Sequence, residues 1–228
     1  MPRIVEVREG ILKKNDVLAR TLRTRFKDSG VFVASLVSSP GAGKTALLQK
    51  TLEGLKETCR VGALVGDLAT DRDARRLAQP GVRVGQITTG TVCHLEAQMV
   101  EHALEGWDLD SLDLLFIENV GNLVCPSSYD LGEHVRIVLL SVTEGEDKPL
   151  KYPTIFNTAD LAVITKIDLA GAVDFDREEA YRNIQDVRPG LEILEVSART
   201  GAGMESWRNR LTEFSQAESS RRPLPQAH

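Results

Sequence analysis

The sequence predicts an α/β fold in which a mostly parallel central sheet carries helices on both faces. Two observations predict it: short apolar runs of strand length alternate with segments of helical periodicity, and a glycine-rich loop joins the first run to a helix. The 228 residues suit one domain. We expect an N-terminal helical segment over 1–30, the main domain over 31–217 and a disordered tail over 218–228.

The individual elements follow in order along the chain. Leu18, Leu22 and Phe26 recur four residues apart and predict a helix over 11–26. Helical periodicity also predicts helices over 44–56 and 92–104. The apolar runs are expected to be strands, over residues 31–37, 61–65, 82–87, 112–117, 137–142, 161–167 and 191–196. Alternation of this kind gives parallel strands joined by crossover helices.

Composition and charge exclude several classes of protein. The chain has 28 basic and 33 acidic residues, and this net charge of −5 does not favour a general nucleic-acid binder. Its apolar stretches are too short to span a bilayer, and its first residues lack the apolar core of a signal peptide. Three cysteines are an odd number, which does not predict a disulfide framework. We expect a cytoplasmic protein with reduced thiols and neither nucleic acid nor membrane as a partner.

A phosphate-binding loop is predicted over residues 38–45, which read Ser-Ser-Pro-Gly-Ala-Gly-Lys-Thr between a strand and a helix. Glycines there let backbone N–H groups point at phosphate oxygens, and the helix start adds its positive end. Lys44 is expected to reach the β- and γ-phosphates as a catalytic group, and Thr45 to bind Mg²⁺. Ser38 departs from the usual pattern, which has glycine there. Nucleotide contacts are predicted for Gly41, Ala42, Gly43, Lys44, Thr45 and Ala46.

Two later segments predict that the base is guanine. Lys166 and Asp168 follow a strand, where a carboxylate can accept both N1–H and the exocyclic amine of guanine. Lys166 can pack its stem over the base plane. Thr165 stands where GTPases usually carry asparagine. Ser197 and Ala198 follow the last strand, where a backbone amide of GTPases meets guanine O6. Either segment alone is equally well explained as a solvated loop, but the pair in this order favours GTP and GDP as ligands.

Acidic residues at strand ends predict a magnesium site and a switch. Asp67 and Glu118 are assigned to Mg²⁺ or its waters, and Asp71 to positioning the attacking water. Gly121 follows Glu118 as in an acidic-x-x-Gly switch, so its N–H is expected to sense the γ-phosphate during catalysis. The alternative for Asp71 and Asp73 is an acidic cluster at a helix N-terminus, which is common.

A second metal site is predicted from two thiols and one imidazole. Cys93 and His94 are adjacent at an expected helix start, and Cys125 follows Gly121 by four residues. This donor set suits Zn²⁺ or Ni²⁺ and leaves a coordination position open. The alternative on spacing alone is two buried cysteines and a surface histidine. If Gly121 moves on hydrolysis, Cys125 moves too, so metal affinity and nucleotide state would be linked.

Five blocks of the sequence carry a family resemblance that covers nearly the whole chain. They are residues 38–45, 66–71, 93–98, 118–126 and 146–153, of which Cys-His-Leu and Glu-Asn-Val-Gly-Asn-Leu-Val-Cys-Pro are the specific ones. The chain resembles the hydrogenase nickel-incorporation GTPases of the HypB family, which belong to the SIMIBI class of P-loop GTPases. The departures at Ser38 and Thr165 are less unusual within this family.

The resemblance implies a slow GTP-hydrolysing metallochaperone that couples nucleotide-dependent dimerisation to nickel delivery for nickel–iron hydrogenase maturation. It implies that Cys93, His94 and Cys125 bind Ni²⁺ or Zn²⁺ at the interface of a homodimer. The implied partners are a HypA-type nickel chaperone and the large-subunit precursor of a nickel–iron hydrogenase.

Lys148 and Lys151 lie in the block over residues 146–153, where they follow a loop rich in charge. Our hypothesis is that one of them crosses the dimer to contact the partner's nucleotide. The alternative is a solvated lid.

Three other functions remain open at this stage. A urease-maturation GTPase is related, but that family carries Cys-Pro-His where this chain has Cys93-His94-Leu95. A nucleotide-gated metal-binding scaffold with negligible turnover would have the same residues. A small-molecule kinase shares the phosphate loop, but the two guanine segments disfavour it.

Overall fold

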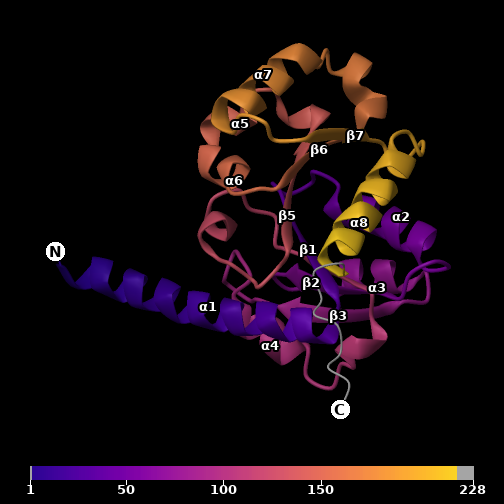
Figure 1. The fold of residues 1–228 in the computed structure, drawn as a ribbon. Helices are drawn as coiled ribbons and strands as arrows, with labels where there is room; N and C mark the ends of the chain where they lie inside the picture. Colours follow the sequence, from indigo (N-terminus) through magenta and orange to yellow (C-terminus); the bar gives the residue numbers. More distant parts are fainter. Residues whose placement is uncertain (1, 220–228) are drawn as a thin grey trace.

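The computed structural model describes residues 2–219, and its seven strands form one sheet (Figure 1). The strands are β1 (Phe32–Val37), β2 (Val61–Asp67), β3 (Arg83–Thr88), β4 (Leu114–Glu118), β5 (Val135–Ser141), β6 (Leu161–Thr165) and β7 (Ile193–Val196). The α-helices are α1 (Pro2–Ser29), α2 (Lys44–Leu55), α3 (Arg72–Ala78), α4 (Ala97–Ala103), α5 (Lys148–Lys151), α6 (Pro153–Asn157), α7 (Arg177–Val187) and α8 (Met204–Ser219). None of the helices in this part of the chain has the length and apolar character needed to cross a membrane.

The strand order is β3-β2-β4-β1-β5-β6-β7, and every pairing is parallel. The predicted α/β class with a mostly parallel sheet is therefore confirmed. β1 lies at the centre, between β4 and β5, so the loop after β1 lies beside the loops that follow its neighbours. Since the carboxyl ends of parallel strands share one edge, residues that follow β1, β2, β4, β6 and β7 can form a single site.

Helices cover both faces of the sheet, as the alternating pattern predicts (Figure 1). On one face α2, α3 and α8 contribute buried residues such as Leu48 and Trp207 to the core. On the other face α1 and α4 cover β1, β2 and β4, with Phe26 among the buried residues. Phe156 of α6 and Ile184 of α7 cover the β5 and β6 half of that face. Strands covered on both sides are mostly apolar, which explains their near-continuous hydrophobic runs.

The helix predicted over 92–104 begins later, at Ala97. In the segment before and at this start, two backbone N–H groups bond to side chains of other elements. The Leu95 N–H donates to Asn119 Oδ1 at 3.0 Å, and the Ala97 N–H donates to Asn15 Oδ1 at 2.9 Å. Residues 92–96 therefore follow an irregular path in place of a helix.

Other boundaries also differ from the predictions, most of the strand ends by one or two residues. The first helix is longer than the predicted 11–26 and spans Pro2–Ser29. The strand expected to reach residue 167 ends at Thr165, because Lys166 adopts a left-handed conformation with φ 58°. Of the tail expected over 218–228, residues 218 and 219 belong to α8, and the remainder lies outside the described residues.

The contact between Trp207 and Thr51 gives a testable link between α8 and α2. The indole Nε1 donates to Thr51 Oγ1 at 2.7 Å, and both side chains are fully buried. Thr51→Val keeps the shape but removes the acceptor, so the free energy of unfolding should fall by about 1–3 kcal/mol. Urea denaturation measures this change. Thr212→Val is the matched control, because Thr212 Oγ1 donates only to the Arg208 carbonyl of its own helix. Equal losses in the two variants would contradict the assigned role.

Candidate functional site

The loop between β1 and α2 has the shape that a phosphate cradle requires. Gly41 and Gly43 adopt φ values of 77° and 96°, which side chains with a Cβ rarely tolerate. Lys44 begins α2, is buried, and donates from Nζ to Ser38 Oγ at 2.9 Å. Burial lowers the pKa of Lys44, and the nearby Glu118 carboxylate partly offsets that effect. The Ser38 hydroxyl, at the position where glycine is usual, thus accepts a hydrogen bond from Lys44, the residue predicted to bind phosphate.

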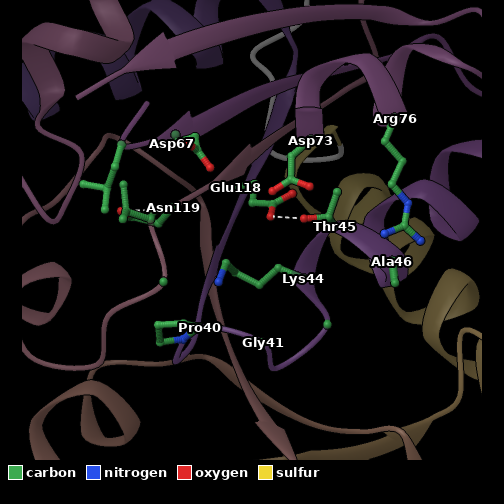
Figure 2. Close-up of a pocket in the computed structure, with 15 residues that line it drawn as sticks. Pro40, Gly41, Lys44, Thr45, Ala46, Asp67, Asp73, Arg76, Glu118 and Asn119 are labelled. Atoms are coloured by element: carbon green, nitrogen blue, oxygen red, sulfur yellow. Dashed lines mark hydrogen bonds between the residues drawn. The ribbon is translucent and has the colours of Figure 1, made fainter. Parts of the chain in front are cut away.

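A cavity of about 430 Å³ lies above this loop, at the carboxyl ends of β1, β2 and β4 (Figure 2). Thr45 Oγ1 donates to Glu118 Oε1 at 2.6 Å, and Asp67 and Asp73 lie on the same cavity wall. The second oxygen of Glu118, Oε2, is buried without a hydrogen-bond partner among the described residues. A hydroxyl and three carboxylates supply the hard oxygen ligands that Mg²⁺ takes beside nucleotide phosphates, so these residues fit that cation.

Glu118 is electrostatically the most unusual group of the cavity. Burial raises its pKa to about 7, although the hydrogen bond from Thr45 and the charge of Lys44 act in the opposite direction. Asp67 differs: burial raises its pKa, but hydrogen bonds from Ala69 and Thr70 outweigh burial and hold the pKa below its usual value. With a pKa of about 7, Glu118 is partly protonated at neutral pH. Such a shifted carboxyl in a cavity is typical of a functional site.

The structure places Asp73, in preference to Asp71, in this cavity. Asp71 precedes α3 and its carboxylate is paired with Arg75, 2.7 Å away, with more than half of the side chain exposed. Asp73 is the second residue of α3 and lines the cavity with Arg76 (Figure 2). The assignment of Asp71 to water positioning therefore passes to Asp73 as a proposal. The sequence offered a signal for Asp73, but its position at a helix N-terminus had an ordinary explanation.

Gly121 lies directly against the phosphate loop. A Cβ at this position would lie 2.8 Å from Pro40 Cα, so only glycine allows the approach. Gly121 lines the same cavity as Lys44 and Thr45. The loop after β4 and the phosphate loop are thus in contact, as a γ-phosphate sensor requires, and the sensing role itself remains a prediction.

A second cavity of about 190 Å³ continues from the first past Gly43 and Ala46, which line both. Asp168 and Ala198 line it, and Asp168 Oδ1 accepts a hydrogen bond from Ser197 Oγ at 2.6 Å. This bond orients the carboxylate that is predicted to read guanine. The full lining is Gly43, Ala46, Leu47, Thr165, Lys166, Asp168, Leu169, Val196, Ala198 and Arg199.

Two bonds tie this base pocket to the phosphate loop. Thr165 Oγ1 donates to the Ala42 carbonyl at 2.6 Å, and Lys166 Nζ donates to the Gly41 carbonyl at 2.6 Å. The threonine that replaces the usual asparagine therefore still contacts the phosphate loop. The Lys166 stem lies along the pocket wall, as a side chain packed over a base would.

The predicted soft-metal ligands come together from two loops. The ligand atoms of Cys93, His94 and Cys125 all lie within 4.8 Å of one another, and the two sulfur atoms are 3.0 Å apart. Both ring nitrogens of His94 are buried and make no hydrogen bond within the described residues, although Nε2 lies 3.4 Å from Glu96 Oε1. Burial lowers the pKa of His94, which favours the neutral imidazole that binds metal. The ring of Tyr129 packs against the imidazole of His94, with the two ring centres 4.0 Å apart.

Asn119 connects the two sites, and the sequence analysis gave it no role. Its side-chain oxygen accepts from Leu95 N at 3.0 Å and from Val120 N at 2.9 Å. Asn119 follows Glu118 in the chain, and Leu95 follows His94. A buried amide after a strand-end carboxylate was the available signal, but its partner is 24 residues away and could not be identified without the fold.

Lys148 and Lys151 do not line either cavity in the described chain. They form the short helix α5, where Lys151 Nζ lies 2.5 Å from Asp147 and Lys148 Nζ lies 5.4 Å from the ring centre of Tyr152. Contact of either lysine with the nucleotide of a second copy of the chain stays a prediction.

Comparison with known proteins agrees with this geometry. The CobW/HypB/UreG nucleotide-binding domain model matches residues 32–195. The chain is 50% identical over 205 residues to the hydrogenase maturation factor HypB of Rhizobium leguminosarum bv. viciae, and the matched region covers 90% of this chain and 69% of that protein. It is 44% identical over 214 residues to the hydrogenase/urease maturation factor HypB of Helicobacter pylori, with 92% and 87% covered. The crystal structure of HypB from Helicobacter pylori in complex with nickel matches with a TM-score of 0.86 at 40% identity, with 94% and 100% covered.

The raised pKa of Glu118 predicts a pH-dependent stability change in Glu118→Gln. In the metal-free and nucleotide-free protein, the pKa of Glu118 is 4.5 in the unfolded chain and about 7 in the folded chain. Stability from this group is therefore fully present below about pH 4.5 and falls as pH rises to about 7, by roughly 3 kcal/mol. Glu118→Gln lacks this loss, so it should be more stable than the wild type by up to about 3 kcal/mol near pH 8.

Urea unfolding at several pH values measures the difference. Glu57→Gln is the control, because the Glu57 side chain is 82% exposed. Its difference from the wild type should be nearly the same at every pH. A Glu118→Gln difference that does not change with pH would contradict the prediction.

Proposed function

This chain belongs to the HypB family of hydrogenase maturation factors, and from that premise we propose that it hydrolyses GTP and couples its nucleotide state to nickel delivery. The observation that carries the proposal is the position of β4. Its end supplies Glu118 to the phosphate cavity, and the loop that follows carries Cys125 to the thiol and imidazole cluster. One short segment therefore belongs to both sites.

In the proposed nucleotide site, Lys44 and the backbone of residues 41–46 bind the phosphates, and Asp168 recognises guanine. Thr45, Glu118 and Asp67 would hold Mg²⁺, which neutralises phosphate charge when bound. Asp73 would orient the attacking water through its carboxylate. We expect turnover to be slow, because the proposed role is that of a switch.

Nickel is the proposed cargo of the Cys93, His94 and Cys125 cluster. Two thiolates and a neutral imidazole bind Ni²⁺ and Zn²⁺ alike, so Zn²⁺ is the expected competitor. Three protein ligands leave room for a further donor, through which the ion can pass to an acceptor. The relative crystallised with nickel supports nickel as the first metal to test.

The contacts of β4 support a physical route for coupling. Gly121 packs against Pro40 of the phosphate loop, so a change at the γ-phosphate would displace the segment that leads to Cys125. Asn119 would carry the same displacement to Leu95 and its neighbour His94. Coupling of this kind is reciprocal, so bound nickel would also change nucleotide affinity.

The wider proposal includes partners. We infer a cytoplasmic homodimer that exchanges nickel with a HypA-type chaperone and the large-subunit precursor of a nickel–iron hydrogenase. Urease maturation stays as a second function, because the Helicobacter pylori relative carries both roles in its name. A nucleotide-gated scaffold with negligible turnover is the remaining alternative.

Phosphate release with GTP and with ATP, each with and without Ni²⁺ or Zn²⁺, tests the core of the proposal. GTP should be preferred, and nickel should bind the GDP form and the GTP-analogue form with different affinities. Cys93→Ala and Cys125→Ala should each weaken nickel binding by roughly tenfold or more. Cys59→Ala is the matched control, because Cys59 packs against the core that α2 and α8 share. A preference for ATP would exclude the proposed GTPase activity. Equal nickel affinity in both nucleotide states would exclude the proposed coupling.

Dimerisation is tested with Lys151→Ala. If Lys151 contacts the partner's nucleotide, its removal should weaken the dimer formed with a GTP analogue by roughly tenfold, since a hydrogen bond to a charged group is lost. Light scattering over a concentration series measures the change. Lys50→Ala removes a comparable exposed lysine that pairs with Glu53 on α2 and should leave the dimer unchanged. Normal dimerisation of Lys151→Ala would remove this lysine from the proposal.

A further inference from the structure

One side chain of α1 touches both loops that carry the thiol and imidazole cluster. Asn15 is 6% exposed and belongs to α1, which packs beside α4 (Figure 1). Its Nδ2 donates to the Asp130 carbonyl at 2.8 Å. Its Oδ1 accepts from the Ala97 N–H at 2.9 Å. These two partners are far apart in sequence, so the amide bridges two separate segments.

Each partner lies close to a predicted metal ligand. Ala97 is the first residue of α4 and follows His94 by three residues. Asp130 follows Cys125 by five residues and comes directly after Tyr129, whose ring packs against His94. Residues 92–96 form no helix or strand, so the hold on Ala97 fixes one end of an irregular segment.

The Ala97 N–H that Asn15 binds has no hydrogen-bond acceptor within its own helix. First-turn N–H groups of a helix have no acceptor within the helix, and the residue before α4, Glu96, provides no side-chain cap. Asn15 therefore caps α4 from another element. The Asn15 amide donates and accepts at the same time, whereas an ionised Asp can only accept and Leu can do neither.

We propose that Asn15 is a positioning residue for the metal site, because it holds the Cys93–His94 loop and the Cys125 loop at the separation that brings their ligand atoms together. The proposal rests on the proposed function in assuming that Cys93, His94 and Cys125 bind nickel. It adds that α1, which supplies no ligand, sets the geometry of the site.

A second contact of α1 separates this role from simple docking of the helix. Arg23 pairs with Asp130 at 2.6 Å and donates to the Glu133 carbonyl at 3.3 Å. Both contacts lie on the Cys125 side alone. Removal of Arg23 breaks an ion pair to the Asp130 side chain but keeps both Asn15 bonds, to the Asp130 carbonyl and from the Ala97 N–H, which makes Arg23→Met a matched control.

The test is nickel titration of the full chain with bound GDP, read by thiolate-to-nickel charge-transfer absorption and by competition with a chromophoric chelator. Asn15→Leu removes both bonds at nearly constant size and should weaken Ni²⁺ binding by roughly tenfold or more. Asn15→Asp keeps an acceptor for Ala97 but loses the donor to Asp130, so it should also weaken binding. Both should change the absorption band, because the ligands are no longer held at one separation. Arg23→Met should stay within about twofold of the wild type.

Two parallel measurements make the outcomes distinct. GDP affinity and the free energy of unfolding are determined for each variant, and GDP affinity should not change. Wild-type nickel affinity and absorption in Asn15→Leu would overturn the inference, as would losses that follow unfolding free energy equally in Asn15→Leu and Arg23→Met. If Asn15→Leu does not fold, Asn15→Asp supplies the same comparison. Absence of nickel binding by the wild-type chain would instead overturn the proposed metal function itself, and the inference with it.

Discussion

The contact between Thr45 and Glu118 is the constraint on which the site depends. It joins the start of α2 to the end of β4, at the centre of the sheet, and it leaves one carboxylate oxygen buried without a partner in the described chain. Keeping this group folded and partly protonated costs stability that a bound cation would return. The residues around it are set by the same strand end, since Asn119 follows at once and Gly121 must fit against Pro40.

The two candidate sites share one set of supports. The end of β4 supplies a wall to the phosphate cavity, and Asn119 holds the segment that contains His94. From the opposite side, α1 holds that segment and the one after Cys125 through a single amide. Ligands from irregular loops can keep a defined geometry only when ordered elements hold both ends of each loop.

Much of the fold could be predicted from the sequence, because continuous apolar runs and a glycine-rich loop report burial and backbone shape directly. The seven strands and the two-sided covering by helices follow from that pattern, whereas the strand order comes from the structure alone. The sequence also pointed to Cys93, His94 and Cys125, which the structure brings together. It could not predict the late start of α4, the choice between Asp71 and Asp73, or the roles of Asn15 and Asn119. The start of α4 and the contacts of Asn15 and Asn119 depend on partners distant in sequence, of which local periodicity carries no record. Asp71 and Asp73 are two residues apart, and which of them faces the cavity depends on how α3 packs.

The pKa of Glu118 has a consequence for calorimetry. A carboxyl with a pKa of about 7 keeps its proton in about half of the molecules at pH 7. If Mg²⁺ binds Glu118 as proposed, the cation would require the ionised form, and its binding near pH 7 would release a fraction of a proton to the solution. The heat of binding would then include the ionisation enthalpy of the buffer, and it would differ between phosphate and Tris although the contacts formed are the same.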